Sequence, residues 1–255
     1  MQTVALALQM YTLRDLAGYD MPGTLRSVAE IGYRYVELAG FGNLKSAGEF
    51  RKALDAARLK VCSAHVSLDD LESDLSRVMD DQDAVGNKAI VVPWLDERRR
   101  RDAAGYEQVA DALNRIGAAI KPRGFTLAYH HHDFEFKTFG GRSGFDILFD
   151  RADRELVKAE LDVYWAKVGG QDPVALIHRM GSRLPLLHLK DLAAGPEARF
   201  AEVGAGILDF PGILAAAARV GVQYGIVEED DTYDTPPLTA VRTSLENLRQ
   251  LGLKP

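Results

Sequence analysis

Three of the six histidines of the chain lie side by side in the segment AYHHHDFEF, residues 128–136, and two acidic residues follow them. Imidazole and carboxylate groups are the side chains that most often bind divalent metals and transfer protons near neutral pH. The segment therefore indicates a metal site, a catalytic base, or a polar strand end with one functional member. The choice depends on the elements that carry these residues.

Eight short segments rich in Val, Ile, Leu and Tyr have the composition of strands. They cover residues 4–10, 35–39, 60–65, 89–94, 126–131, 157–163, 184–190 and 224–229. Longer segments with helical spacing lie between them. In residues 103–121, for example, apolar side chains recur every three or four positions, at Tyr106, Val109, Leu113, Ile116 and Ile120.

This alternation of strands and helices predicts an α/β fold with a parallel sheet. Eight βα units in 255 residues match the size of a closed (β/α)₈ TIM barrel, and no linker rich in Pro, Gly or Ser divides the chain. We therefore expect a single TIM-barrel domain over residues 1–255. An open doubly wound sheet is the main alternative, but it needs a glycine-rich turn after the first strand, and QMYTLRDL has none.

In a barrel of this kind, the active site lies at the carboxyl ends of the strands. The residues that close the eight segments are unusually rich in ionisable groups: Gln9, Glu37, His65, Trp94, His130 to Glu135, Asp162, His188 with Lys190, and Glu228 with Glu229. Side chains alternate along a strand, so His188 and Lys190 should face the same side. Carboxylates and imidazoles gathered in a buried site require a divalent cation or protons to neutralise them.

Charge and hydropathy narrow the partners of the chain. The 31 Lys and Arg against 37 Asp and Glu give a net charge of −6, which disfavours nucleic acid and anionic membranes. The first residues lack a basic segment before their apolar run, and no run approaches the roughly 20 apolar residues of a membrane span. We expect a cytoplasmic protein with a small-molecule substrate; whether it forms a homo-oligomer stays open.

The single cysteine, Cys62, cannot form an internal disulfide, and no residues near it have zinc-ligand spacing. We expect it to be a small buried hydrophobic residue on a strand.

The segment YHHHDFEF resembles YHNHDFEF of the xylose isomerase-like TIM-barrel superfamily, which includes sugar phosphate isomerases/epimerases, ketose 3-epimerases and inosose dehydratases. The resemblance runs nearly from end to end. It also includes LQMYTLRD, IGYRYVEL, LDVYWAKVGGQDPVALI, PLLHLKDL, EVGAGILDFPGIL and YGIVEED. Together these segments are specific, whereas each alone would be weak.

The resemblance implies one divalent metal ion held by Glu135, Asp162, His188 and Glu228. His130 or His132 could compete with Glu135 for the ion. Alternation allows only one of Glu228 and its neighbour to point inward, and the family pattern selects Glu228. Three oxygen ligands with one imidazole favour Mn²⁺, Mg²⁺ or Co²⁺, and Zn²⁺ is compatible.

The resemblance also implies a sugar isomerase or epimerase that transfers a proton next to a carbonyl through an enediolate, with Glu135 and Glu228 as the acid/base pair. Lys190 could bind a substrate oxygen or form a salt bridge to Glu160 or Asp162. The expected substrate contacts are His65, Trp94, His130, His132, Trp165 and Lys190.

The acidic loop from Glu228 to Asp234 would repel a phosphate, so an unphosphorylated keto sugar or cyclitol is the expected carbohydrate substrate. Elimination from the same enediolate is the alternative outcome, in a dehydratase or lyase of a keto-inositol or a 3-keto-glycoside. An endonuclease IV-like phosphodiesterase would be expected to need further metal ligands and a basic face, which the sequence lacks. A sugar-binding barrel without activity would not require so many ionisable ligands.

Overall fold

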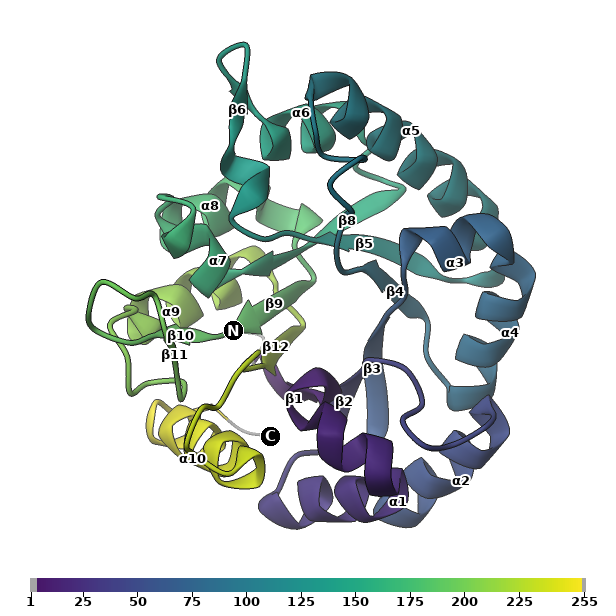
Figure 1. Ribbon diagram of the computed structural model, residues 1–255, viewed down its shortest axis with the longest axis vertical. Helices are drawn as coiled ribbons and strands as arrows, with labels where there is room; N and C mark the ends of the chain where they lie inside the picture. The colour runs from purple at the N-terminus through teal and green to yellow at the C-terminus, as the bar shows by residue number, and fades with distance from the viewer. Residues whose placement is uncertain (1–3, 254–255) are drawn as a thin grey trace.

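The computed structural model of the chain describes residues 4–253, and its centre is a closed barrel of eight parallel strands (Figure 1). The barrel strands are β1 (Ala5–Gln9), β2 (Tyr35–Leu38), β3 (Lys60–His65), β4 (Ala89–Val92), β5 (Thr126–His130), β8 (Val157–Asp162), β9 (Leu186–Leu189) and β12 (Tyr224–Val227). Each strand lies within one predicted segment, and β1 pairs with both β2 and β12 to close the sheet. The predicted (β/α)₈ barrel is confirmed, and the open sheet is excluded.

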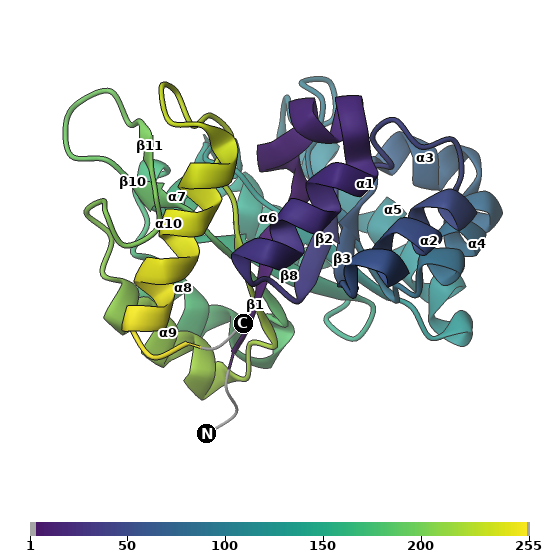
Figure 2. The same ribbon diagram turned by 90° about the horizontal axis from the view of Figure 1, so that it is seen from below.

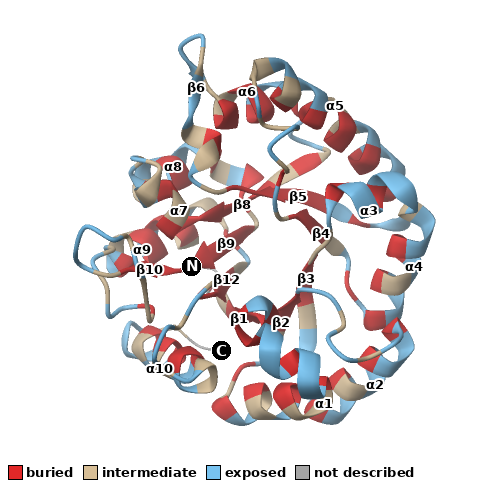
Figure 3. Cartoon of the chain, in the orientation of Figure 1, coloured by how far each residue is buried: buried red, intermediate tan, exposed pale blue. Residues whose placement is uncertain are grey.

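Helices surround the barrel and bury one face each against it (Figures 1 and 3). The buried stripe predicted for residues 103–121 is present on α5, where Val109, Leu113 and Ile120 are inaccessible to solvent. The α-helices are α1 (Arg14–Ile31), α2 (Ala47–Ala57), α3 (Leu68–Ser73), α4 (Leu75–Val85), α5 (Ala103–Ile120), α6 (Gly144–Arg151), α7 (Val163–Val168), α8 (Pro173–Met180), α9 (Phe210–Val220) and α10 (Pro237–Gln250). Within residues 4–253, no helix combines the length and apolar composition needed to cross a membrane.

Short elements that the sequence did not predict follow several strands. Four 3₁₀-helices occur, η1 (Met10–Leu13), η2 (Lys121–Arg123), η3 (Phe134–Phe136) and η4 (Gly181–Arg183). Two small antiparallel hairpins pair β6 (Thr138–Phe139) with β7 (Arg142–Ser143), and β10 (Asp191–Leu192) with β11 (Phe200–Ala201). The β10–β11 hairpin lies at the upper end of the molecule in Figure 2. Of these elements, η3 and the β6–β7 hairpin follow β5 and the β10–β11 hairpin follows β9, so they shape the carboxyl end of the barrel.

The interior of the barrel is divided into an apolar layer and a polar layer. The apolar layer contains Ala7, Cys62, Val91, Ala128, Leu186 and Ile226. Two residues further along β1, β5, β9 and β12, the same face carries Gln9, His130, His188 and Glu228. Because side chains alternate along a strand, one face changes from apolar to ionisable toward its carboxyl end. Cys62 is buried in the apolar layer, as expected.

Arg183, in η4, is a buried cation that links three chain segments. Its guanidinium donates to the carbonyl oxygens of Phe149 at 2.6 Å, Ala152 at 2.8 Å and Val157 at 2.9 Å. Burial lowers the pKa of Arg183 to about 10, so the side chain stays charged at neutral pH. The side chain therefore satisfies three carbonyl groups that connect α6 to β8.

We predict that Arg183→Met lowers the free energy of unfolding by about 2–4 kcal/mol, because buried carbonyl groups lose charged hydrogen-bond donors. For a chain of this size, the melting temperature should fall by about 5–10 °C in a thermal unfolding experiment. Arg154→Met, at an exposed neighbouring arginine, is the control and should change the melting temperature little. An equal change in both variants would contradict this role of Arg183.

Candidate active site

Ionisable side chains from most of the barrel strands meet at the carboxyl end of the barrel. Two groups have ligand atoms that lie within 4.8 Å of one another. The first group contains Asp162, His188 and Glu228, and the second contains His65, His130, Glu160 and His188. The structure thus brings together three of the four residues that the sequence predicted as metal ligands.

His188 belongs to both groups and uses a different ring nitrogen in each. Its Nδ1 atom lies 2.9 Å from Glu228 Oε2 and 3.9 Å from Asp162 Oδ2. Its Nε2 atom lies 2.6 Å from Glu37 Oε2 and 3.0 Å from Glu160 Oε1. The Glu37 carboxylate also accepts a hydrogen bond from Gln9 Nε2 at 2.7 Å. The two glutamates therefore hold the imidazole so that Nδ1 faces Asp162 and Glu228.

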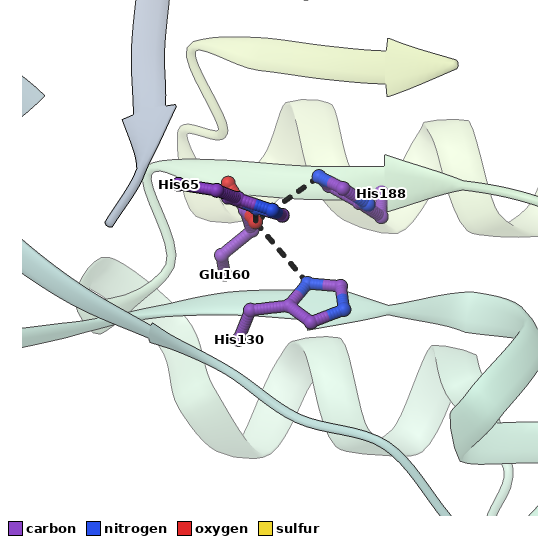
Figure 4. A group of neighbouring side chains, drawn as sticks. All are labelled: His65, His130, Glu160 and His188. Carbon is purple, nitrogen blue, oxygen red and sulfur yellow. Dashed lines mark hydrogen bonds and ion pairs between the residues drawn. The ribbon is translucent and has the colours of Figure 1, made fainter. Parts of the chain in front are cut away.

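Glu160 joins three imidazoles through one carboxylate oxygen (Figure 4). Oε1 of Glu160 lies 2.8 Å from His65 Nε2 and 3.1 Å from His130 Nδ1. Burial and the nearby His188 lower the pKa of His130 well below its usual range, so its imidazole is neutral. A neutral ring that donates through Nδ1 keeps Nε2 as an acceptor, and this atom lies 3.9 Å from Asp162 Oδ2. His130 therefore offers a further nitrogen to the first group.

Asp162 is fixed by its position between β8 and α7. Its Oδ1 atom accepts a hydrogen bond from the backbone N–H of Trp165 at 2.9 Å and caps α7, while Oδ2 makes no hydrogen bond. The backbone N–H of Asp162 donates to His131 Nε2 at 3.1 Å. Burial lowers the pKa of His131 to about 4, so this middle histidine is neutral and has a structural role.

Lys190 is buried among carboxylates. Its Nζ atom lies 2.8 Å from Glu228 Oε2, 3.3 Å from Asp162 Oδ2 and 2.9 Å from Asp230 Oδ1. Burial alone would lower the pKa of Lys190, but these carboxylates raise it well above its usual value. The side chain is therefore an ammonium, and the salt bridge to Asp162 considered for it is present.

The two adjacent acids at the end of β12 point in different directions. Glu228 faces His188 and Lys190. Glu229 faces away, since its carboxylate accepts a hydrogen bond from Ser244 at 3.3 Å and its backbone N–H donates to Thr12 at 2.9 Å. Burial would raise the pKa of Glu228, but Lys190 and His188 lower it, whereas burial raises that of Glu229 to about 7. The inward residue is Glu228, as the family pattern indicated.

Glu135 lies outside both groups. It belongs to η3, where its Oε2 atom accepts from the backbone N–H of His132 at 2.7 Å and its Oε1 atom accepts from the Tyr129 hydroxyl. Both oxygens are thus engaged within the loop that follows β5. Its predicted roles as a metal ligand and as an acid/base residue stay predictions.

The donors around His188 fit a divalent cation. Buried carboxylate oxygens without a hydrogen-bond partner remain on Glu37, Glu160 and Asp162. The separations of 2.9 Å and 3.9 Å from His188 Nδ1 bracket the roughly 3.0–3.5 Å expected between neighbouring ligands of an ion bound at about 2.1 Å. Oxygen and imidazole donors of this kind suit first-row divalent metals.

A cavity of about 470 Å³ opens onto these groups. Its lining consists of Tyr11, Ala39, His65, Pro93, Trp94, His130, His132, Lys190, Glu228 and Asp230. Five of the six predicted substrate contacts are therefore in the lining. Trp165 is not among these residues, but its ring lies 5.3 Å from that of His132.

His132 presents an unpaired imidazole at this cavity. Its Nδ1 atom has no hydrogen-bond partner, and its ring stacks on Phe134 at 5.2 Å. Burial and the Lys190 ammonium lower the pKa of His132 well below its usual range, so the ring is neutral. A neutral imidazole beside a cavity can accept a proton from a bound molecule.

Glu160 was expected only as a possible salt-bridge partner of Lys190 and Asp230 only as part of the acidic loop, although alternation could have placed both in the site. Glu160 lies two residues before Asp162 on β8, and Asp230 lies two residues after Glu228. Residues at this spacing face the same side of an extended chain. Glu37 was among the strand ends, but its contact with His188 spans 151 positions and no local spacing indicates it.

A second cavity of about 440 Å³ lies outside the barrel against α6 and α8. Its Arg179 side chain is paired with Asp146 at 2.9 Å, and Arg183 is occupied by backbone carbonyls. The cavity inside the barrel is therefore the candidate active site.

The chain belongs to the xylose isomerase-like TIM barrel family, whose family model matches residues 25–251. Among solved structures, a sugar phosphate isomerase/epimerase from Parabacteroides distasonis is similar to it, with a TM-score of 0.83 and 25% identity over 98% of this chain and 94% of that chain. The resemblance found in the sequence is thus confirmed.

Curated relatives include two inosose dehydratases. The enzyme of Clostridium beijerinckii is 26% identical over 185 residues, 62% of this chain. The match spans 61% of that relative, or about three fifths of its length. The enzyme of Lacticaseibacillus casei is 24% identical, and the match covers 82% of this chain and 85% of the relative.

We predict that Glu135 makes stability depend on pH. Burial raises the pKa of Glu135 from 4.5 to about 8, against the hydrogen bonds from Tyr129 and His132 that lower it. Between these values the folded protein holds a proton that the unfolded chain releases. The free energy of unfolding should therefore fall as pH rises, by on the order of 1 kcal/mol per pH unit from this group.

Urea unfolding at several pH values between about 5 and 9, in chelator, measures this slope. Glu135→Gln should lack the contribution and become more stable relative to the unsubstituted protein as pH rises. Glu155→Gln, at an exposed glutamate, controls for the change in net charge. Parallel curves for the unsubstituted protein and Glu135→Gln would contradict the prediction.

Proposed function

We propose that the chain is a divalent-metal-dependent enzyme that removes a proton from a carbon next to the carbonyl of an unphosphorylated keto sugar or keto cyclitol. One observation carries the proposal: Glu228, a member of the group with Asp162 and His188, lines the same cavity as the imidazole of His132. Metal ligands and a base beside one cavity are the two parts that this chemistry needs.

Asp162, His188 and Glu228 would hold the ion, with His130 as a fourth ligand in place of the expected Glu135. When bound, the ion would polarise the substrate carbonyl and stabilise the negative charge that develops on its oxygen. Two carboxylates and two imidazoles suit Mn²⁺, Co²⁺ or Zn²⁺, and Mg²⁺ less well.

His132 is the proposed base. Its ring lines the cavity and is neutral, so an imidazole nitrogen that faces the cavity can take the proton from the carbon. Glu228 is a weaker candidate, because its Oε2 atom is already paired with Lys190 at 2.8 Å and His188 at 2.9 Å. A carboxylate paired with an ammonium gives up its charge reluctantly.

Elimination is the outcome that we favour. The Lys190 ammonium lines the cavity and could give a proton to a hydroxyl group departing from the next carbon. The base then gains the carbon proton, the C–O bond breaks, and the hydroxyl leaves as water. The inosose dehydratases among the relatives support this outcome.

Isomerisation or epimerisation is the second candidate, supported by the similarity to the Parabacteroides distasonis sugar phosphate isomerase/epimerase. It needs a second acid/base group to return the proton at another position or face. Glu135 was expected to serve, but both of its oxygens are engaged by Tyr129 and His132.

The cavity favours a substrate without phosphate. Among the described residues that line it, Lys190 is the only Lys or Arg, and three carboxylates already neutralise it. Glu228 and Asp230 add negative charge at the same place. A dianion would meet repulsion from these carboxylates, and no Lys or Arg of the lining is left unpaired to bind it.

The metal assignment predicts that purified protein binds about one divalent ion per chain, and that Asp162→Ala and His188→Ala lose it. His130→Ala should weaken binding, whereas Glu135→Gln should retain it. Equilibrium dialysis with Mn²⁺, followed by elemental analysis, measures the number of metal ions bound per chain. Glu229→Gln is the control, since this carboxylate points away from the cavity.

Chelator should also lower the melting temperature, because a bound ion stabilises the folded state. Unchanged metal content in both Asp162→Ala and His188→Ala would refute the site. Loss of metal in Glu135→Gln with full binding in His130→Ala would instead make Glu135 the fourth ligand.

The reaction is tested with Mn²⁺ in D₂O on a panel of unphosphorylated inososes, ketoses and 3-keto-glycosides, with products followed by NMR. Proton removal next to a carbonyl followed by reprotonation should incorporate deuterium at that carbon in the remaining substrate or in an isomerised product, whereas elimination removes the hydrogen of that carbon without replacing it. An unsaturated product identifies elimination, and a rearranged sugar identifies isomerisation.

His132→Ala should lower turnover by at least about a hundredfold while metal content stays unchanged. His178→Ala, at an exposed histidine on α8, is the matched control. Turnover in which the carbon next to the carbonyl keeps its original hydrogen would exclude the proposed chemistry. Full activity of His132→Ala would exclude His132 as the base.

A further inference from the structure

The cavity has a polar side and an apolar side. The polar side carries the ionisable groups already described. The apolar side is formed by Tyr11, Ala39, Pro93 and Trp94, which follow β1, β2 and β4, with His65 at the end of β3 between Ala39 and Pro93. In the closed barrel, β1 and β4 are separated by β2 and β3 (Figure 1), so Tyr11 and Trp94 come from well-separated parts of the rim.

Two large side chains on the apolar side are unusually exposed. Trp94 is 48% exposed and Tyr11 is 43% exposed. Other large hydrophobic residues are exposed in the described part of the chain, but none of them lines this cavity. Exposed aromatic rings gathered in a concave site are typical of ligand-binding surfaces, whereas single ones elsewhere are common.

Each of these rings has an arginine beside it. The Arg100 guanidinium lies 5.5 Å from the Trp94 ring centre, and that of Arg14 lies 4.4 Å from the Tyr11 ring centre. Cation–π contacts restrict the movement of the rings. Rings that are already ordered lose less conformational entropy when a ligand binds between them.

The cavity is larger than one sugar ring requires. Its volume of about 470 Å³ corresponds to roughly 15 water molecules at about 30 Å³ each, whereas a hexose has about a dozen heavy atoms, which are packed more closely by covalent bonds. A keto ring on the polar side, next to His132 and Lys190, would therefore leave the apolar side unfilled.

We propose that the apolar side binds an aromatic group attached to the sugar ring, so that the substrate is a keto sugar with an aryl aglycone. This inference rests on the proposed function, since it takes the keto ring to occupy the polar side. A second sugar ring is a poorer fit, because the Tyr11 hydroxyl and the Trp94 indole N–H are the only polar side-chain groups among these four residues. The hydroxyl groups of a second sugar would lose hydrogen bonds to water there.

Binding of two probes tests the inference without turnover. Isothermal titration calorimetry in the presence of Mn²⁺ compares phenyl glucoside with methyl glucoside, each as its α and β anomer. Phenyl glucoside should bind at least about tenfold more tightly in one anomeric form, because only its aglycone has an aromatic ring that can pack against the exposed rings of the apolar side.

Trp94→Ala and Tyr11→Ala should each reduce this preference, and the double variant should abolish it. Trp94→Phe should retain most of it, because a planar ring remains. Tyr19→Ala is the control, since this tyrosine is 89% exposed and does not line the cavity.

Equal affinity for the two probes, failure of phenyl glucoside to bind, or an unchanged preference in the double variant would overturn the proposed subsite. Because neither probe contains a ketone, the result does not depend on proton transfer. Turnover in which the carbon next to the carbonyl keeps its hydrogen, with an intact phenyl preference, would refute the proposed reaction and leave the aryl subsite standing.

Discussion

The burial of charge at the carboxyl end of the barrel is the constraint on which the site depends. Glu37, Glu160, Asp162 and His188 are all inaccessible to solvent, and Lys190 is nearly so. Isolated buried charges are costly, so each carboxylate must contact a cation and each cationic side chain must contact a carboxylate. Both ring nitrogens of His188 contact carboxylates. The four carboxylates come from β2, β8 and the end of β12. The same pairing that makes the polar layer tolerable also orients the proposed metal ligands.

The barrel separates this polar layer from the rest of the core by simple alternation. On β9, Leu186, His188 and Lys190 occupy successive inward positions, and the residues between them face the helices. The apolar layer at the amino-terminal side excludes water below the site, while the short elements after β5 and β9 cover its rim. Electrostatic interactions in such an enclosed site are stronger than at an exposed surface. The fold thus supplies the low-dielectric surroundings that proton transfer from carbon requires.

Within the loop after β5, three consecutive histidines have three different surroundings. His130 faces the carboxylates, His131 accepts a hydrogen bond from the backbone of Asp162, and His132 faces the cavity. The three adjacent histidines therefore have three different roles: a proposed metal ligand, a structural contact and a proposed base. The division follows from the alternation of side chains at the end of a strand.

The sequence by itself determined the eight strands, the barrel and the inward positions of Asp162, His188 and Glu228, because these depend on local periodicity and on motifs of contiguous residues. The tertiary structure decided which carboxylates surround His188. Glu37 reaches it from 151 positions away, a contact that arises only when the barrel closes. The tertiary structure also decided the orientation of Glu135, since the turn of η3 directs this carboxylate to Tyr129 and the backbone of His132. Strand periodicity ends at the last residue of the strand, so side-chain directions beyond it depend on packing in the folded chain.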